Sequence, residues 1–227
     1  MKRGVAIRVA SLSAMEAEAG SNTAEWMSAA EMARLVAMGS PKRRRQFIAG
    51  HWLARAMAAE MTGTHPADWL LVAAAHGAPE LRLRGTDAAQ GIHLSLSHSG
   101  DVVAAAVASF PLGIDVESAG RVRDWLALAA YVFAPEECEQ LLQLPATDRE
   151  QLFYRYWTLK EAHGKREGSG LRLSKSRTQC ARECDEREAI AITWQCDGQC
   201  VALVGERDMR ISARGIPAAA QQRFWQF

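Results

Sequence analysis

The chain has 227 residues, of which 48% are hydrophobic and 23% are charged, enough for one large domain or two small ones with cores of their own. Its 27 basic and 26 acidic side chains leave a formal net charge of +1, so no overall field favours nucleic acid as a partner. The longest uncharged apolar runs, at 70–75 and 102–108, are far shorter than the roughly 20 residues that span a bilayer, and the N-terminal pattern is not that of a secretory signal. We therefore expect a cytoplasmic protein without a membrane or nucleic-acid partner.

The first half of the sequence predicts two helices followed by several strands. Ser28 and Glu31 form a capping-box pattern that opens a short helix toward Met38. Pro41 suits the first turn of a second helix, which carries a buried apolar stripe until Gly63. Strand patterns follow at 70–75, 92–98, 102–108 and 112–116.

The second half predicts helices first and then a strand pair. Helical patterns cover 135–144 and, more strongly, 148–163, with Gly164 marking the end of the longer helix. Two strand patterns then flank an Asp197-Gly198 turn signal, at 189–194 and 199–204.

The two halves resemble each other faintly in this order of elements, and no low-complexity linker divides them. We predict an α+β fold made of two similar α/β subdomains that meet near residue 112. The N-terminal subdomain is placed at 1–111 and the C-terminal subdomain at 112–227.

The five cysteines are an odd number without a secretion signal, which favours reduced thiols. Four of them form two C-x₃-C pairs, a spacing that structural zinc permits but that is unspecific. Cys196 and Cys200 flank a turn signal and would lie on two paired strands, so ordinary half-buried side chains are the favoured interpretation.

Two carboxylates stand two residues apart at the end of the fourth strand pattern. Because strand side chains alternate, Asp115 and Glu117 face the same side, an arrangement that generally needs a cation or strong donors. A solvated strand end is the other interpretation. On the long helix, Trp157, Glu161 and Lys165 share one face at a spacing of four, where a simple Glu161–Lys165 ion pair is the alternative. Together, the three carboxylates could supply the hard oxygen ligands that Mg²⁺ prefers.

These residues resemble a known family. Leu112-Gly-Ile-Asp-Val-Glu117 and, about forty residues later, Trp157-Thr-Leu-Lys-Glu-Ala-His-Gly-Lys165 are similar to the paired signature of 4′-phosphopantetheinyl transferases. That signature reads G-[IV]-D and then [FW]-[SCT]-x-K-E-[AS]-x-x-K. Further matches are Leu96-Ser-His-Ser99, Phe133-Ala-Pro-Glu-Glu137 and Glu167-Gly-Ser-Gly-Leu171. The length, the two-halved layout and the W/KEA residues resemble the monomeric surfactin-synthetase-activating type, whose fold is a pseudo-dimer within one chain.

The resemblance implies a monomeric transferase that depends on Mg²⁺, with Mn²⁺ as an alternative metal. It would move the 4′-phosphopantetheine arm of its substrate coenzyme A to a serine of an apo acyl or peptidyl carrier protein and release 3′,5′-ADP. By match to the motif, Asp115, Glu117 and Glu161 would hold the metal against the diphosphate. Lys165 would bind coenzyme A and stabilise the leaving group, and Glu161 is the first candidate for the base that takes the serine proton. The resemblance implies that Asp115 is catalytic as well as Glu161 and Lys165. Lys160 would have a structural or a phosphate-binding role.

For the 3′-phosphate of coenzyme A, the resemblance implies His98, assisted by Ser97, in the N-terminal subdomain. A basic residue from the run before Phe47 would join them, because an arginine fork suits phosphate oxygens. Gln46 occupies the position where the closest register has an arginine, so the choice within the run stays open. Arg45 is the preferred candidate, and Arg44 and Lys42 are the alternatives. Without the flanking motifs, a hydrogen-bonded strand histidine and a solvated helix face are the simpler interpretations.

One departure from the family pattern is Gly77-Ala78-Pro79, where the family often has G-K-P. The change removes a lysine contact and bears on coenzyme A affinity more than on the chemistry.

Two other classes of protein fit the same residues. One is an Mg²⁺-dependent phosphohydrolase that uses the three acids, and the other is a non-enzymatic coenzyme A- or nucleotide-binding module whose basic 42–45 patch docks an acidic partner. A binding module has little use for three converging acids, which favours the transferase. The motifs do not specify whether the carrier serves fatty acid, polyketide or nonribosomal peptide biosynthesis.

Overall fold

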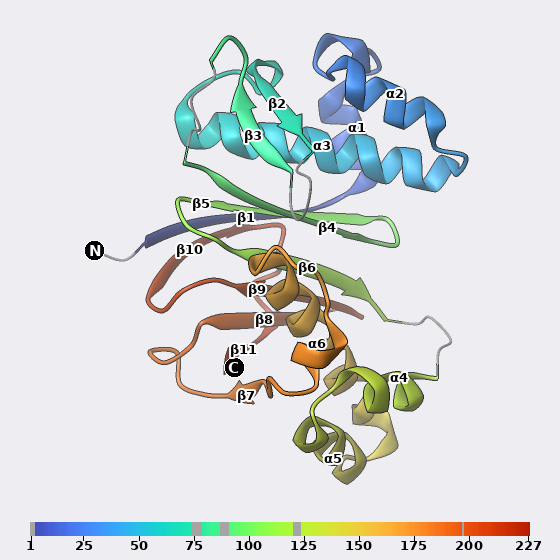
Figure 1. The fold of residues 1–227 in the computed structure, drawn as a ribbon, viewed down its shortest axis with the longest axis vertical. Coiled ribbons are helices and arrows are strands. Elements are labelled where there is room, and N and C mark those ends of the chain that lie inside the picture. The colour runs from blue at the N-terminus through green and yellow to red at the C-terminus, as the bar shows by residue number, and fades with distance from the viewer. Residues whose placement is uncertain (1–2, 74–78, 87–90, 120–123, 197) are drawn as a thin grey trace.

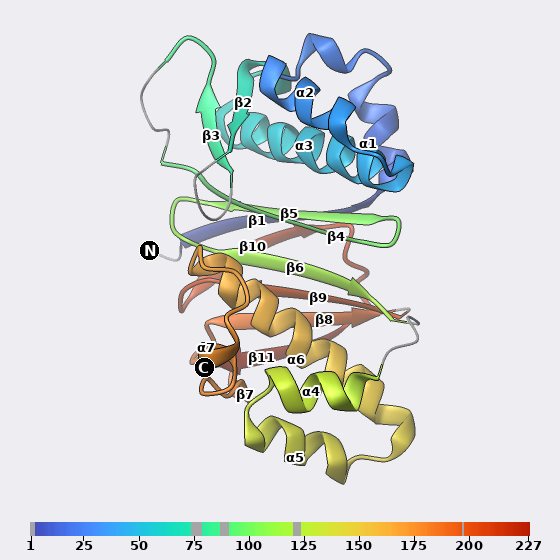
Figure 2. The ribbon, with the colours of Figure 1, turned by 45° about the vertical axis from the view of Figure 1, so that its right-hand side comes forward.

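The computed structural model describes residues 3–73, 79–86, 91–119, 124–196 and 198–227. Two main β-sheets lie in the middle of the molecule, and one long helix packs on an outer face of each (Figure 1, Figure 2). The predicted α+β fold class is confirmed.

The first sheet has the strand order β10-β1-β5-β4. β1 runs parallel to β10, and the other neighbours are antiparallel. Because side chains alternate along a strand, Val103, Ala105 and Val107 of β5 face the helix side, whereas Ala104 and Ala106 face the second sheet. The four strands are β1 (Arg3–Ser11), β4 (His93–Ser99), β5 (Val102–Ala108) and β10 (Met209–Arg214).

Helix α3 (Pro41–Thr62) covers this sheet. Ser40 caps its first turn, Pro41 occupies a position that needs no backbone donor, and Gly63 ends it in the left-handed conformation at a φ of 74°. Leu53 and Met57 are 0% and 2% exposed in the core that α3 shares with β5. Burying a side chain of this size contributes about 1.5–3 kcal/mol. The same side of the molecule carries α1 (Leu12–Ala19), the 3₁₀ turn at Thr23–Glu25, α2 (Ala29–Ala37), the 3₁₀ turn at Pro66–Asp68, and the pair β2 (Trp69–Val72) and β3 (Glu80–Leu83).

The second sheet has the strand order β6-β9-β8-β11-β7, and every neighbouring pair is antiparallel. Its central β8–β9 pair is the strand pair predicted at 189–194 and 199–204. The five strands are β6 (Gly113–Ser118), β7 (Arg182–Glu183), β8 (Ala191–Cys196), β9 (Gln199–Val204) and β11 (Gln221–Gln226).

Helix α6 (Ala146–Arg166) lies on the outer face of the second sheet (Figure 2). It is longer than predicted, because Gly164 lies inside the helix instead of ending it. A Cβ on Gly164 would come within 2.5 Å of the backbone of Gly170, so this glycine permits the close approach of the following loop. The helices beside α6 are α4 (Trp125–Val132), α5 (Pro135–Gln143) and α7 (Leu173–Ser176).

A further hydrophobic core fills the space between the two sheets. On β6, Ile114 and Val116 are buried in it, at 0% and 1% exposure. The alternate side chains, Asp115 and Glu117, therefore lie on the opposite face of the strand, under α6. The strand period predicted from the sequence thus places both carboxylates beneath the long helix.

Strands β4 and β6 meet along a row of three serine hydroxyls, which we call the serine seam. One edge of β6 pairs with β9, and the serines cover the other edge. Hydroxyl oxygens here take the place of the carbonyl ladder that would join two strands of one sheet. The oxygens of Ser95, Ser97 and Ser99 accept, at 2.9, 3.3 and 3.1 Å, the backbone N–H groups of Ile114, Val116 and Ser118.

Several expectations need correction or stay open. The strand predicted at 70–75 is β2, which ends at Val72. Residues 74–75, the turn residues Gly77 and Ala78, and Asp197 lie outside the described residues. The boundary between 111 and 112 and the pseudo-dimer stay predictions, and β10 of the second half pairs with β1 of the first.

Cys138, Cys180, Cys184 and Cys200 are free thiols. Within the described ranges, no helix combines the length and the apolar character that crossing a membrane requires.

Candidate active site

Helix α6 and strand β6 bring the three predicted carboxylates to one place. Gly113 lets the two elements pack in direct contact, because a Cβ there would lie 1.8 Å from the carbonyl oxygen of Ala162. Asp115 and Glu117 project from the strand, and their charges act on Glu161 of the helix. The glycine of the G-I-D pattern is therefore a packing residue that sets the distance between strand and helix.

Asp115 is the most buried of the three acids, at 5% exposure. Its Oδ1 accepts hydrogen bonds from the Ser97 hydroxyl at 2.6 Å and from Lys165 Nζ at 2.7 Å, and Lys165 also donates to the carbonyl oxygen of Ile114 at 3.1 Å. Its Oδ2 is buried and has no hydrogen-bond partner in the part of the chain that the structure describes. A buried acceptor without a donor costs about 1–3 kcal/mol, so this oxygen is a candidate cation ligand.

Glu117 is held at both carboxylate oxygens by neutral donors. The Ser99 hydroxyl donates to Oε2 at 2.9 Å, and the indole N–H of Trp157 donates to Oε1 at 3.2 Å. The Trp157 ring stacks on Phe153 with the ring centroids 5.9 Å apart. Since neither donor carries a charge, the carboxylate is oriented while its negative charge stays available.

Glu161 is half-buried, and no side chain or backbone group of the described residues donates a hydrogen bond to it. Burial raises the pKa of its carboxyl above the usual 4.5, and the charges of Asp115 and Glu117 raise it further, against the opposing effect of Lys165. The three carboxylates therefore lie within electrostatic reach of one another. A cation between them would relieve their repulsion.

The charge and the chemistry of this cluster fit a divalent cation. The three carboxylates and Lys165 leave a formal excess of two negative charges, and carboxylate oxygens are ligands that Mg²⁺ and Mn²⁺ accept. Across the described ranges, however, no three His, Cys, Asp or Glu side chains are already grouped as a metal site. The ammonium of Lys165 lies within this cluster, where it bonds Asp115 Oδ1.

Lys160, the neighbour of Glu161, points away from the acids. It is 3% exposed, and its Nζ lies 2.8 Å from Glu137 Oε2 and donates to the carbonyl oxygens of Ser176 and Gln179. Glu137 belongs to the F-A-P-E-E match, so this ion pair ties α5 to α6 and to the segment after α7. Of the two roles open for Lys160, the structure supports the structural one.

A pocket of about 290 Å³ lies next to the acids, between the N-terminal half of α3, the end of α2 and β4. Arg34, Arg43 and His98 line it, and so does Ser97, whose hydroxyl bonds Asp115. Burial lowers the pKa of His98 below 6.5, and the positive charges of Lys165 and Arg43 lower it further. Arg34 and Arg43 make the pocket a cationic surface, and Ser97 connects it to the carboxylate cluster.

The three basic residues preferred on resemblance do not line this pocket. Arg43, which was not among them, does. Because Arg43 precedes Phe47 by four residues and Gly50 by seven, all three share one helix face, and this face lines the pocket. Lys42 lies 3.6 Å from Asp101, Arg44 donates to the carbonyl oxygens of Val36 and Met38, and Arg45 forms a 2.9 Å ion pair with Glu16.

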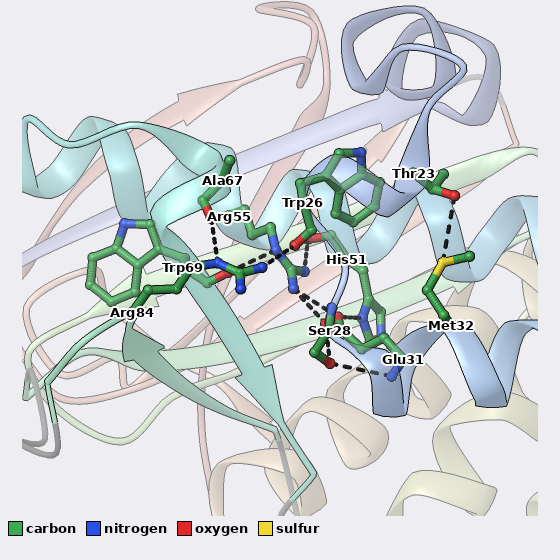
Figure 3. A network of polar contacts seen from close by, with 10 residues as sticks. All are labelled: Thr23, Trp26, Ser28, Glu31, Met32, His51, Arg55, Ala67, Trp69 and Arg84. Atoms are coloured by element: carbon green, nitrogen blue, oxygen red, sulfur yellow. Dashed lines mark hydrogen bonds and ion pairs between the residues drawn. The ribbon is translucent and has the colours of Figure 1, made fainter.

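A buried network holds α2, and with it Arg34, against α3 (Figure 3). Glu31 is 2% exposed and accepts hydrogen bonds from Arg55 Nη2 at 2.9 and 2.7 Å and from His51 Nδ1 at 2.6 Å. Burial opposes ionisation of Glu31, but the hydrogen bonds from His51 and Arg55 lower its pKa to about 2. The predicted capping box with Ser28 is confirmed, and the second role of Glu31 is one that local sequence does not reveal.

Comparison with known proteins decides the family. The family model of the 4′-phosphopantetheinyl transferase superfamily matches residues 111–214. The chain is 30% identical over 159 residues to a 4′-phosphopantetheinyl transferase of Bacillus subtilis. This match covers 65% of this chain and 68% of that protein. The chain belongs to the 4′-phosphopantetheinyl transferase superfamily. It is also 34% identical over 146 residues to the 4′-phosphopantetheinyl transferase HetI of Nostoc sp., and 37% identical over 81 residues to the 4′-phosphopantetheinyl transferase Sfp of Bacillus subtilis strain 168. These two matches cover 64% and 36% of this chain, and the chain spans 61% and 35% of the lengths of the two relatives.

In this member of the 4′-phosphopantetheinyl transferase superfamily, the range that matches the family model covers only part of the candidate site. The three acids and Lys165 lie within 111–214. His98 and Arg43, which line the cationic pocket, precede this range. The fold brings the two parts together through Ser97, which lines the pocket and bonds Asp115.

Proposed function

We propose that the protein transfers the 4′-phosphopantetheine group of coenzyme A to a serine of an apo acyl or peptidyl carrier protein and releases 3′,5′-ADP. One observation carries the proposal. Three carboxylates and Lys165, with a formal excess of two negative charges, adjoin a cationic pocket of about 290 Å³. Coenzyme A needs both surfaces, since its diphosphate binds a divalent cation and its 3′-phosphate binds basic side chains.

The residues that would hold Mg²⁺, or Mn²⁺ in its place, are Asp115, Glu117 and Glu161. The bound cation would neutralise charge on the diphosphate. The unpartnered Oδ2 of Asp115 and the raised pKa of Glu161 support this assignment, because a cation would give the first a partner and would offset the burial and the negative charges that raise the second. In the same account, Arg43, Arg34 and His98 bind the 3′-phosphate side of coenzyme A, where the pocket presents them together.

The chain's own residues also account for the proton and the leaving group. The carrier serine oxygen forms a bond to the β-phosphorus, and the bond from that phosphorus to the bridging oxygen breaks, which releases 3′,5′-ADP. Glu161 accepts the serine proton, directly or through a water, because it is the acid of the cluster to which no group of the described residues donates a hydrogen bond. Lys165 stabilises the charge that the leaving group gains. We further propose a monomer of the surfactin-synthetase-activating type that acts in the cytoplasm.

The deciding experiment is incubation of the protein with a panel of apo carrier proteins, coenzyme A and Mg²⁺, followed by intact-mass analysis of each carrier. A gain of one phosphopantetheine group per carrier is the expected result. Cleavage of coenzyme A without a change in carrier mass would indicate a phosphohydrolase. Binding of coenzyme A without either change would indicate a binding module.

A further inference from the structure

We infer that Ser99 is a positioning residue for the candidate metal site, and that Ser97 has the same role for the neighbouring acid. The inference rests on the proposed function, because it concerns the cation that the three acids would hold. It starts from the serine seam, where two of the three hydroxyls contact an acid as well as a backbone N–H group.

Ser99 and Ser97 repeat one arrangement along the seam. The Ser99 oxygen accepts a hydrogen bond from the N–H of Ser118, and its hydroxyl donates one to Glu117 Oε2 at 2.9 Å. The Ser97 oxygen accepts a hydrogen bond from the N–H of Val116, and its hydroxyl donates one to Asp115 Oδ1 at 2.6 Å. In both cases the backbone of β6 fixes the hydroxyl, and the hydroxyl then fixes the acid one residue earlier on the same strand. The acids are thereby oriented by the strand that carries them.

The choice of donor matters for a cation site. Ser97 and Ser99 are 8% and 3% exposed, so water does not replace these hydroxyls readily. A hydroxyl orients a carboxylate without cancelling its charge, whereas an arginine or lysine in its place would form an ion pair and leave less charge for a metal. Among the described residues, the donors to Glu117 are the neutral groups of Ser99 and Trp157, so no ion pair with a donor offsets its negative charge.

The seam contains its own control at Ser95. Its hydroxyl accepts the N–H of Ile114 at 2.9 Å, as the other two serines accept theirs, and Ser95 is equally buried at 1% exposure. The residue one position before Ile114 is Gly113, which has no side chain to orient and cannot gain one against Ala162. Replacing Ser95 therefore removes a seam hydrogen bond without releasing an acid.

The experiment compares Ser99→Ala, Ser97→Ala and Ser95→Ala with the wild type. The readouts are Mn²⁺ binding at saturating coenzyme A, measured by electron paramagnetic resonance of free Mn²⁺, and coenzyme A binding without metal, measured by calorimetry. We expect the Mn²⁺ dissociation constant to rise about tenfold in Ser99→Ala and Ser97→Ala, the size of one hydrogen bond to a charged group. It should stay within about twofold in Ser95→Ala, and Ser99→Thr, which keeps the hydroxyl, should recover most of the loss.

The outcomes separate the inference from the proposed function. Unchanged Mn²⁺ binding in Ser99→Ala, or an equal loss in Ser95→Ala, would overturn the positioning role while carrier modification by the wild type stands. A wild type that binds no Mn²⁺ with coenzyme A would overturn the metal site and this inference together. Thermal unfolding of the three alanine variants checks that each is folded. All three lose one seam hydrogen bond, and Ser97→Ala and Ser99→Ala also lose the hydrogen bond to an acid.

Discussion

The buried carboxyl of Glu31 allows a quantitative test of the network that holds α2, the helix that carries Arg34, against α3. Its pKa falls from 4.5 to about 2 in the folded protein, which at 1.36 kcal/mol per pKa unit corresponds to roughly 3 kcal/mol of stability. Because the folded pKa is the lower one, this contribution is fully present above pH 4.5 and is lost as the pH falls toward 2. Glu31→Gln keeps the shape of the side chain but leaves Arg55, which is 0% exposed, without its charge partner.

We predict that Glu31→Gln lowers the free energy of unfolding by about 3 kcal/mol at neutral pH, and that the difference from the wild type shrinks as the pH falls below 4.5. Urea unfolding at a series of pH values from neutral to about pH 3 measures both quantities. The matched control is Glu60→Gln, which breaks an exposed ion pair with Arg214 and should cost less than about 1 kcal/mol. A loss for Glu31→Gln as small as that of the control, or one independent of pH, would refute the reasoning.

Two further predictions concern ligand binding. Arg43→Gln should weaken coenzyme A binding about tenfold or more, because Arg43 lines the cationic pocket. Arg45→Gln should change the dissociation constant less than about twofold, because Arg45 pairs with Glu16 outside the pocket. Calorimetry measures both constants, and a larger effect of Arg45→Gln would favour Arg45, the residue preferred on resemblance. The affinity for Mn²⁺ at saturating coenzyme A should rise with pH above 4.5, because the raised pKa of Glu161 lets a proton compete with the cation for this carboxylate. Glu161→Gln should lose this pH dependence. An equally steep dependence in the variant would show that another group titrates.

Much of the candidate site follows from local periodicity. The period of two along β6 predicts that Asp115 and Glu117 share a face, and the spacing of four along α6 predicts that Glu161 and Lys165 do. Both patterns hold because each element is regular across the residues concerned, and the helix continues through Gly164. The basic residue that binds the 3′-phosphate stays a prediction, and the structure adds Arg43, which lines the pocket, to the candidates.

Other parts of the site depend on contacts between segments far apart in the sequence. The serine seam forms only because β4 lies along the free edge of β6, and no local pattern states which edge a strand covers. The sequence allows either a structural or a phosphate-binding role for Lys160. Its ion pair with Glu137, which only the folded chain reveals, shows that Lys160 faces the core. The pairing of β1 with β10 joins residues about 200 positions apart, which short-range patterns cannot reveal.

The most direct test of the account is the dependence of carrier modification on the three-acid cluster. Intact-mass analysis of an apo carrier incubated with coenzyme A and Mg²⁺ should show one phosphopantetheine group with the wild type. No added group should appear with Glu161→Gln or Asp115→Ala, although both variants keep the unfolding cooperativity of the wild type. Transfer at the wild-type rate by both variants would contradict the claim that these carboxylates gather around one cation to perform the chemistry.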